Sequence, residues 1–181
     1  MKDSLRLFPY LFVIFLRIIT PFFIWKNVVL VLILSSFLDL IDSEFFRLAI
    51  NSWKSLSSDS QKGRTYKKID KILDFYWYVF ILVYMRASPL FLIFAFLFLL
   101  RLIGMFVYFI TKYKKTFIFF PNLFETLFIV FVIVLIYPVF GFLLQGSNIY
   151  LTILGLIPFK LLQEYICCIE KPNLGYLFKR K

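Results

Sequence analysis

The chain has 181 residues, of which 62% are hydrophobic, with 26 phenylalanines, no histidine and a formal net charge of +11. Soluble chains are only about half apolar, and the apolar excess here gathers into runs close to the ~20 residues that cross a bilayer. This composition excludes a soluble globule, a disordered chain and a collagen-like repeat. We therefore expect an all-α polytopic integral membrane protein.

Hydrophobic segments follow one another along the whole chain. A polar loop over residues 51–68 separates the second from the third. The first is expected to be retained, because Arg17 interrupts its apolar run and no small-residue cleavage site follows. No repeat, glycine-rich linker or second domain is visible, so residues 1–181 are predicted to form a single membrane domain. The six predicted spans cover about residues 8–25, 28–50, 70–88, 89–111, 117–139 and 148–169.

Basic residues are distributed unevenly between the connections. They concentrate in the 51–68 loop, in a short run over residues 112–115 and at both chain ends, whereas the alternate connections are nearly uncharged. The positive-inside rule then predicts six spans with both termini in the cytoplasm. Most of the positive charge is then expected at the cytoplasmic surface of the cell (cytoplasmic) membrane, facing anionic lipid headgroups. No nucleic-acid partner is expected.

Acidic residues lie inside two of the apolar segments. Asp39 and Asp42 are three residues apart near the end of the second, and Asp70 and Asp74 are four apart at the start of the third. Each pair therefore occupies one face of its helix. The predicted topology makes these two helices antiparallel and places both pairs towards the cytoplasm, so the four carboxylates can meet. An ionisable group in a bilayer costs at least ~2.5 kcal/mol, which requires a partner for each.

Divalent cations are the interpretation that we favour for these acids. Carboxylates without His or Cys suit Mg²⁺, Mn²⁺ or Ca²⁺ rather than zinc, and a metal open to the cytosol is a common means of gripping phosphates. Two simpler interpretations stay open, namely a cation or proton path and interfacial salt bridges. Arg17 either extends to the interface or pairs with an acid of another span. The candidate salt-bridge partners are Arg47, Lys67, Lys68 and Lys71.

Two motifs resemble the signature of the CDP-alcohol phosphatidyltransferases, DxxDGxxAR followed by a spacer and GxxxDxxxD. The motifs are DLIDSEFFR over residues 39–47 and DKILD over residues 70–74. All four acids and the arginine are in register, whereas Ser43, Phe46 and Tyr66 replace small residues of the signature. An arginine in the first span followed by a proline, and an arginine in the fourth, are also similar to that family.

The resemblance implies six helices around a polar cavity open to the cytoplasm, usually in a homodimer. It implies an enzyme of phospholipid biosynthesis that moves a phosphatidyl-type group from a CDP-linked lipid, such as CDP-diacylglycerol, to an alcohol and releases CMP. It also implies that Asp74 is the general base and that Ser43 and Arg47 lie against the nucleotide. The implied ligands of two Mg²⁺ or Mn²⁺ ions are Asp39, Asp42, Asp70 and Asp74.

The acceptor alcohol and the ester or ether linkage of the lipid stay open. A phosphorylated polyol is slightly favoured, because Arg101, Lys112 and Lys160 offer cations for a second phosphate. Lys160 and Glu164 are four residues apart and are also expected to pair within one helix. Two other functions are compatible with the sequence: a cation transporter or channel that uses the aspartates, and a non-catalytic relative of the family.

Overall fold

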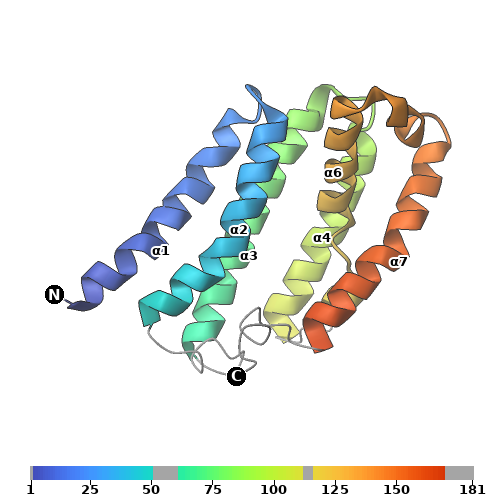
Figure 1. Ribbon diagram of the computed structural model, residues 1–181. Helices are drawn as coiled ribbons and strands as arrows, with labels where there is room; N and C mark the ends of the chain where they lie inside the picture. Colours follow the sequence, from blue (N-terminus) through green and yellow to red (C-terminus); the bar gives the residue numbers. More distant parts are fainter. Residues whose placement is uncertain (1, 51–60, 112–115, 170–181) are drawn as a thin grey trace, which may run out of the picture. The chain divides into compact units, whose positions relative to one another are not determined.

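The computed structural model describes the chain except for residues 1, 51–60, 112–115 and 170–181 (Figure 1). Over the described residues the protein is helical and contains no strand, which confirms the predicted all-α class. The chain divides into two compact units, Met1–Ala87 and Ser88–Lys181. The prediction of one membrane domain stays a prediction.

The first unit contains three long helices, of which α1 packs mainly against α2 and also touches α3. Local signals explain the break between α1 and α2. Pro21 opens a 3₁₀ turn, where its fixed φ is favourable, and the Thr20 hydroxyl donates to the Leu16 carbonyl (2.7 Å). The Asn27 side chain then accepts from the Leu30 N–H (3.0 Å) and caps α2. The elements are α1 (Lys2–Ile19), η1 (Thr20–Phe23), α2 (Val28–Ile50), α3 (Gln61–Tyr84) and η3 (Met85–Ala87).

Aromatic contacts tie the apolar end of α3 to the turn between α1 and α2. The Phe80 ring contacts Phe22, Trp25 and Tyr76, with centroids 4.9, 6.0 and 5.0 Å away. The Tyr76 hydroxyl donates to the Ile18 carbonyl (2.9 Å). The two helices before the polar stretch and the one after it therefore share a core. Its buried members include Val31, Leu38, Leu73, Trp77, Tyr78, Ile81 and Met85.

The second unit is built around phenylalanine rings. Phe94 is fully buried and meets Phe124, Phe128 and Phe131 edge-on, an arrangement that favours the quadrupoles of the rings. These four rings come from two helices, α4 and α6, and hold them together. The elements are α4 (Phe91–Thr111), α5 (Thr116–Phe119), α6 (Leu123–Ile136), η4 (Pro138–Leu144) and α7 (Asn148–Ile169).

Two predicted boundaries are corrected by the structure. The predicted polar loop over residues 51–68 ends early, because α3 begins at Gln61 and makes residues 61–68 helical. Lys, Arg and Gln are good helix formers in water, so this part of the helix needs no apolar run. The predicted fifth span over residues 117–139 is divided into α5 and α6. The division contains Pro121, which has no N–H to donate, and Asn122, which caps α6 through the Glu125 N–H.

By length and hydropathy, one described helix is able to cross a membrane, and a second if a bent pair counts as one span. The first is α4, with a mean hydropathy of 2.5, and the pair is Pro138–Leu144 with Asn148–Tyr165, bent by 90°. The described residues thus support one or two such helices and not the six that the sequence predicts. Helix α6 has only 14 residues. Helices α2 and α3 contain several charged residues, among them Asp39 and Asp42 on α2 and Asp70 and Asp74 on α3.

Large apolar side chains are exposed along one face of several helices. On α1 and α2 they recur at intervals of three and four residues, which places each set on one side of its helix. A helix that faces water normally carries polar residues there. These exposed residues are Phe8, Leu11, Phe12, Phe15 and Ile18 on α1, and Leu30, Ile33, Leu34, Phe37 and Leu40 on α2.

Candidate functional site

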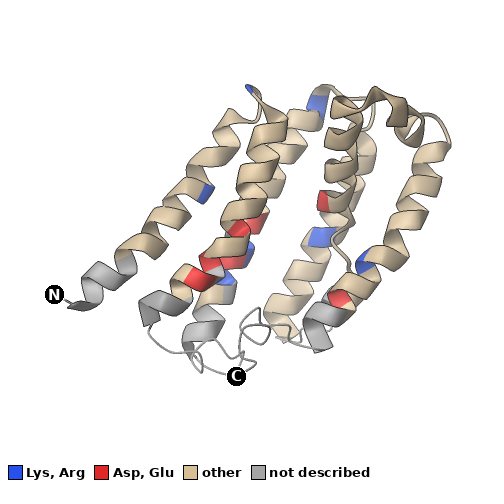
Figure 2. Cartoon of the chain, in the orientation of Figure 1, with Lys and Arg blue, Asp and Glu red and all other residues tan. Residues whose placement is uncertain are grey.

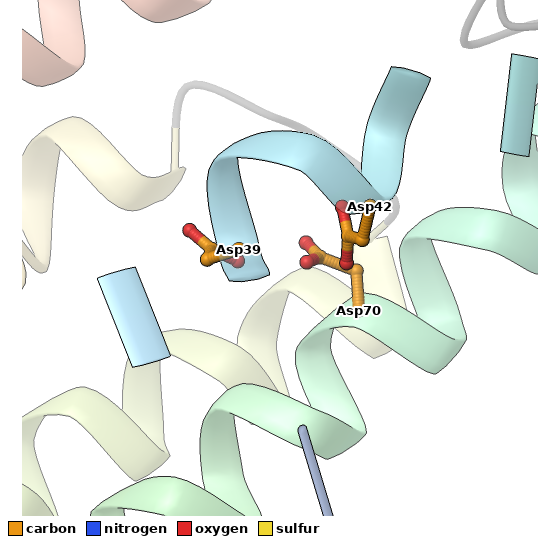
Figure 3. Close-up of side chains that lie close together, drawn as sticks. All are labelled: Asp39, Asp42 and Asp70. Carbon is orange, nitrogen blue, oxygen red and sulfur yellow. The ribbon is translucent and has the colours of Figure 1, made fainter. Parts of the chain in front are cut away.

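Acidic residues of α2 and α3 lie on nearby stretches of these two helices (Figure 2). One carboxylate oxygen from each of Asp39, Asp42 and Asp70 lies within 4.8 Å of the other two. Figure 3 shows Asp42 on α2 and Asp70 on α3 approaching one another, with Asp39 one turn away. The structure therefore brings together three of the four predicted metal ligands, from two helices separated by the longest polar stretch of the chain.

Arg17 of α1 contacts all four aspartates. Its Nη2 lies 2.8 Å from Asp39 Oδ1 and 3.1 Å from Asp74 Oδ1. Its Nη1 lies 3.4 Å from Asp70 Oδ1 and donates to Asp42 Oδ2. The Arg17 side chain is only 8% exposed, and a planar guanidinium with several donors suits such multiple contacts. Of the two alternatives for Arg17, pairing with acids of other helices is the one found.

Lys71 and Tyr66 provide the remaining donors. Lys71 Nζ donates to Asp74 Oδ2 (2.6 Å) and lies 3.1 Å from Asp70 Oδ2, and Tyr66 Oη donates to Asp42 Oδ1 (2.6 Å). Both oxygens of Asp42, Asp70 and Asp74 thus contact a donor of the protein. Among the described side chains, Arg17 and Lys71 place two positive charges among the four carboxylates.

The contact of Tyr66 with the cluster was not predicted, although the spacing between Tyr66 and Asp70 could have indicated it. It precedes Asp70 by four residues, as Asp70 precedes Asp74, so the three share one face of α3. Burial, reinforced by the negative charge of Asp42, raises the pKa of the Tyr66 phenol, which therefore stays protonated and donates. Its ring stacks on Phe46 (centroids 4.8 Å apart), and Phe46 meets Tyr10 edge-on (4.9 Å). Aromatic rings thus occupy two positions where the resembling signature has small residues.

The cluster has the chemistry of a divalent-cation site. Opposite oxygen ligands of Mg²⁺ are about 4 Å apart, so small movements of the three carboxylates would allow shared coordination, and hard carboxylate oxygens suit Mg²⁺ or Mn²⁺. The Asp42 side chain is 2% exposed, whereas that of Asp39 is 56% exposed. The cluster is therefore open on the Asp39 side. Asp74 is outside the group of three but is held beside it by Arg17.

The nucleotide-binding prediction falls on residues whose side chains the structure does not describe. Ser43 and Arg47 belong to α2, but their side chains lie outside the described part of the protein. Lys112, one of the predicted acceptor-binding residues, lies outside the described residues altogether. The roles of these three residues stay predictions.

Arg101 and Lys160, the other predicted acceptor-binding residues, belong to the second unit. Arg101 is buried, donates to the Phe120 carbonyl (3.0 Å) and lies 4.0 Å from Glu164 Oε1. Lys160 donates to Gln163 Oε1 (2.9 Å), so the predicted pair of Lys160 with Glu164 is not the one formed. The physical reason is that Glu164 approaches a buried guanidinium, while Lys160 has an amide within reach on its own helix.

Comparisons with protein-family models, with curated proteins and with solved structures find no match. The likeness to the CDP-alcohol phosphatidyltransferases therefore depends on the spacing of the signature residues. What the structure adds is the placement of those residues: three of the acids share one cluster, and Arg17 links the fourth to it. A functional assignment accordingly has to be argued from this cluster.

Proposed function

We propose that the chain is a membrane-embedded, divalent-metal-dependent phosphotransferase of the CDP-alcohol phosphatidyltransferase type. It would transfer a phosphatidyl-type group from a CDP-linked lipid to an alcohol and release CMP, in phospholipid biosynthesis. The supporting observation is that Asp39 and Asp42 of α2 and Asp70 of α3 place carboxylate oxygens within 4.8 Å of one another. Asp39 and Asp42 are the two acids in the first half of the signature that the sequence resembles, and Asp70 is the first acid of its second half.

The charge of the cluster supports a cation site. Four carboxylates lie around Arg17 and Lys71, and grouping carboxylates in a partly buried place is costly unless cations lie among them. Asp39, Asp42 and Asp70, together with Asp74, would hold Mg²⁺ or Mn²⁺. The bound metal would supply neutralisation of the charge that develops on the pyrophosphate of the donor.

Asp74 is the residue that we assign to proton transfer. Its carboxylate would accept the proton of the acceptor hydroxyl, whose oxygen then forms a bond to the lipid-side phosphorus. The bond from this phosphorus to the oxygen of CMP breaks, and CMP leaves with the electron pair. Both oxygens of Asp74 contact Arg17 or Lys71, and a carboxylate oxygen has a second lone pair with which it can accept the proton.

Asp74→Asn tests this assignment, since it retains the size of the side chain and removes its basicity. We expect metal-dependent CMP release from CDP-diacylglycerol and an alcohol to fall by about 10²-fold or more, measured in membranes that contain equal amounts of protein. EDTA should abolish release by the unmodified protein. Glu125→Gln, in an acid that contacts Asn122 on α6, is the control and should remain active. Full activity of Asp74→Asn would reject the assigned base.

We further propose that the chain crosses the membrane six times, with both termini and the aspartate cluster on the cytoplasmic side, and that it forms a homodimer. The apolar faces exposed on α1 and α2 support a lipid environment. Charged side chains make α2 and α3 too polar to pass as membrane spans by composition. Among them, Asp42 of α2 and Asp70 of α3 both contact Arg17. Ionisable groups inside membrane bundles are usually paired in this way.

A non-catalytic relative is the second candidate, and a specific observation favours it. Phe46 and Tyr66 stack at two positions where the signature has small residues, and an added ring there takes space from a nucleotide. The two candidates differ in ligand binding. The enzyme should melt at a higher temperature with CDP and Mg²⁺ together than with either alone, whereas the non-catalytic relative should not respond.

A cation transporter would instead show ion flux in liposomes without nucleotide.

A further inference from the structure

We propose that Arg17 is a built-in counter-ion of the aspartate cluster that a divalent metal displaces. Without metal, its guanidinium holds the carboxylates of α2 and α3 together. When metal binds, the guanidinium leaves them. This inference deepens the proposed function and rests on it for the identity of the competing cation.

The contacts of Arg17 place it where a metal would lie. It reaches Asp39, Asp42 and Asp70, the three residues whose oxygens come within 4.8 Å of one another, and it also reaches Asp74. A guanidinium with an 8% exposed side chain and a divalent ion would repel strongly at such close range. The two cations are therefore alternatives for the same carboxylates.

The charge count points the same way. Arg17 contributes one positive charge to the four carboxylates that it contacts. Its departure makes the cluster more negative by one charge, so its release strengthens the attraction of the cluster for metal. Arg17 lies in the last turn of α1 and its side chain is long and unbranched, so this release needs a change of rotamer and no unwinding of the helix.

A fixed positioning role for Arg17 makes the opposite prediction. If Arg17 only held the aspartates in place for the metal, its removal would weaken metal binding. If Arg17 competes with the metal, its removal strengthens metal binding and lowers the stability of the metal-free protein. The sign of the change in metal affinity therefore separates the two roles.

The first experiment titrates the full chain in lipid nanodiscs with Mn²⁺ and measures free Mn²⁺ by electron paramagnetic resonance. We expect Arg17→Gln to lower the Kd by about tenfold or more, and Arg17→Lys, which keeps the charge, to stay much closer to the unmodified protein. Metal-free Arg17→Gln should melt at a lower temperature and gain more from Mn²⁺. An unchanged or higher Kd in Arg17→Gln would overturn the proposal.

The second experiment needs no variant, and so it holds even if Arg17→Gln does not fold. Phenylglyoxal modification of arginines in the unmodified protein is mapped by mass spectrometry with and without Mn²⁺. Modification of Arg17 should rise several-fold with Mn²⁺, because its guanidinium leaves the carboxylates. Exposed Arg86 and buried Arg101 are internal controls that should not change. Equal modification of Arg17 in both conditions would overturn the proposal.

The two proposals fail in different ways. Displacement of Arg17 by Mn²⁺ without any CMP release would reject the transferase and leave the exchange intact. Metal-dependent CMP release with no change of Mn²⁺ affinity in Arg17→Gln would reject the exchange and leave the transferase intact. Absence of Mn²⁺ binding in both the unmodified protein and the Arg17→Gln variant would reject both.

Discussion

The ring of Phe46 lies between two tyrosines, and this contact bears on both packing and function. It is 7% exposed and sits 4.8 Å from the Tyr66 ring and 4.9 Å from the Tyr10 ring, measured between centroids. Tyr66 in turn donates to Asp42. The aromatic group therefore connects the interior of the first unit to a carboxylate of the candidate site.

Phe46→Ala should separate the packing role of this ring from its effect on the nucleotide. We expect the free energy of unfolding to fall by about 3–5 kcal/mol, the usual cost of removing a buried phenylalanine, and the affinity for CDP with Mg²⁺ to rise because space is opened. Thermal melting and calorimetric titration measure the two effects. Phe37→Ala, on the exposed face of the same helix, should change neither. Weaker CDP binding in Phe46→Ala would count against a nucleotide at this position.

Residue spacing predicted the aspartates of the site better than their partners. Pairs at three and four residues fix which aspartates share a helix face, and this is local information. Arg17 is distant in sequence from all four, and only the packing of α1 against α2 and α3 decides that its side chain reaches them. Long-range pairing of this kind leaves no spacing pattern, so the sequence left two alternatives for Arg17.

At the scale of elements, Gly104 of α4 lies at a close approach. A Cβ at this position would be 2.4 Å from the Cβ of Phe120, just after α5, whereas one at Gly155 of α7 would have no neighbour within 4 Å. We expect Gly104→Ala to destabilise the protein by about 1–3 kcal/mol through overpacking, and Gly155→Ala to be neutral or stabilising by up to ~1 kcal/mol. Melting temperatures in one detergent measure both. Equal effects of the two variants would contradict the close approach.

Helix positions were predictable where an apolar run and a clear end signal coincide. The second predicted segment and α2 both cover residues 28–50, with Asn27 as the cap. The sequence missed the start of α3 at Gln61, because a helix that begins in polar residues has no hydrophobic run to mark it. It also missed the break at Pro121, which is hidden inside an apolar stretch.

At the scale of the whole molecule, the proposed six crossings can be tested by cysteine labelling. In a background without Cys167 and Cys168, a membrane-impermeant maleimide should label Ser147→Cys in intact cells. It should label Ser58→Cys only after permeabilisation, because the positive-inside rule places the 51–68 loop in the cytoplasm. Labelling of both positions only after permeabilisation would contradict six crossings. Release of the protein from membranes by alkaline carbonate would contradict integral insertion.

The contact of Arg17 with four aspartates also has a consequence for synthesis of the chain. Helix α1 leaves the ribosome first, whereas Asp70 and Asp74 emerge only with α3. In a bilayer, an ionised arginine without a partner is costly for a membrane helix to carry. On the proposed six-crossing topology, the first helix would therefore reach its stable position only after the third has been made. The first three helices would enter the membrane as one cooperative group, and α1 would be a poor anchor for a truncated chain.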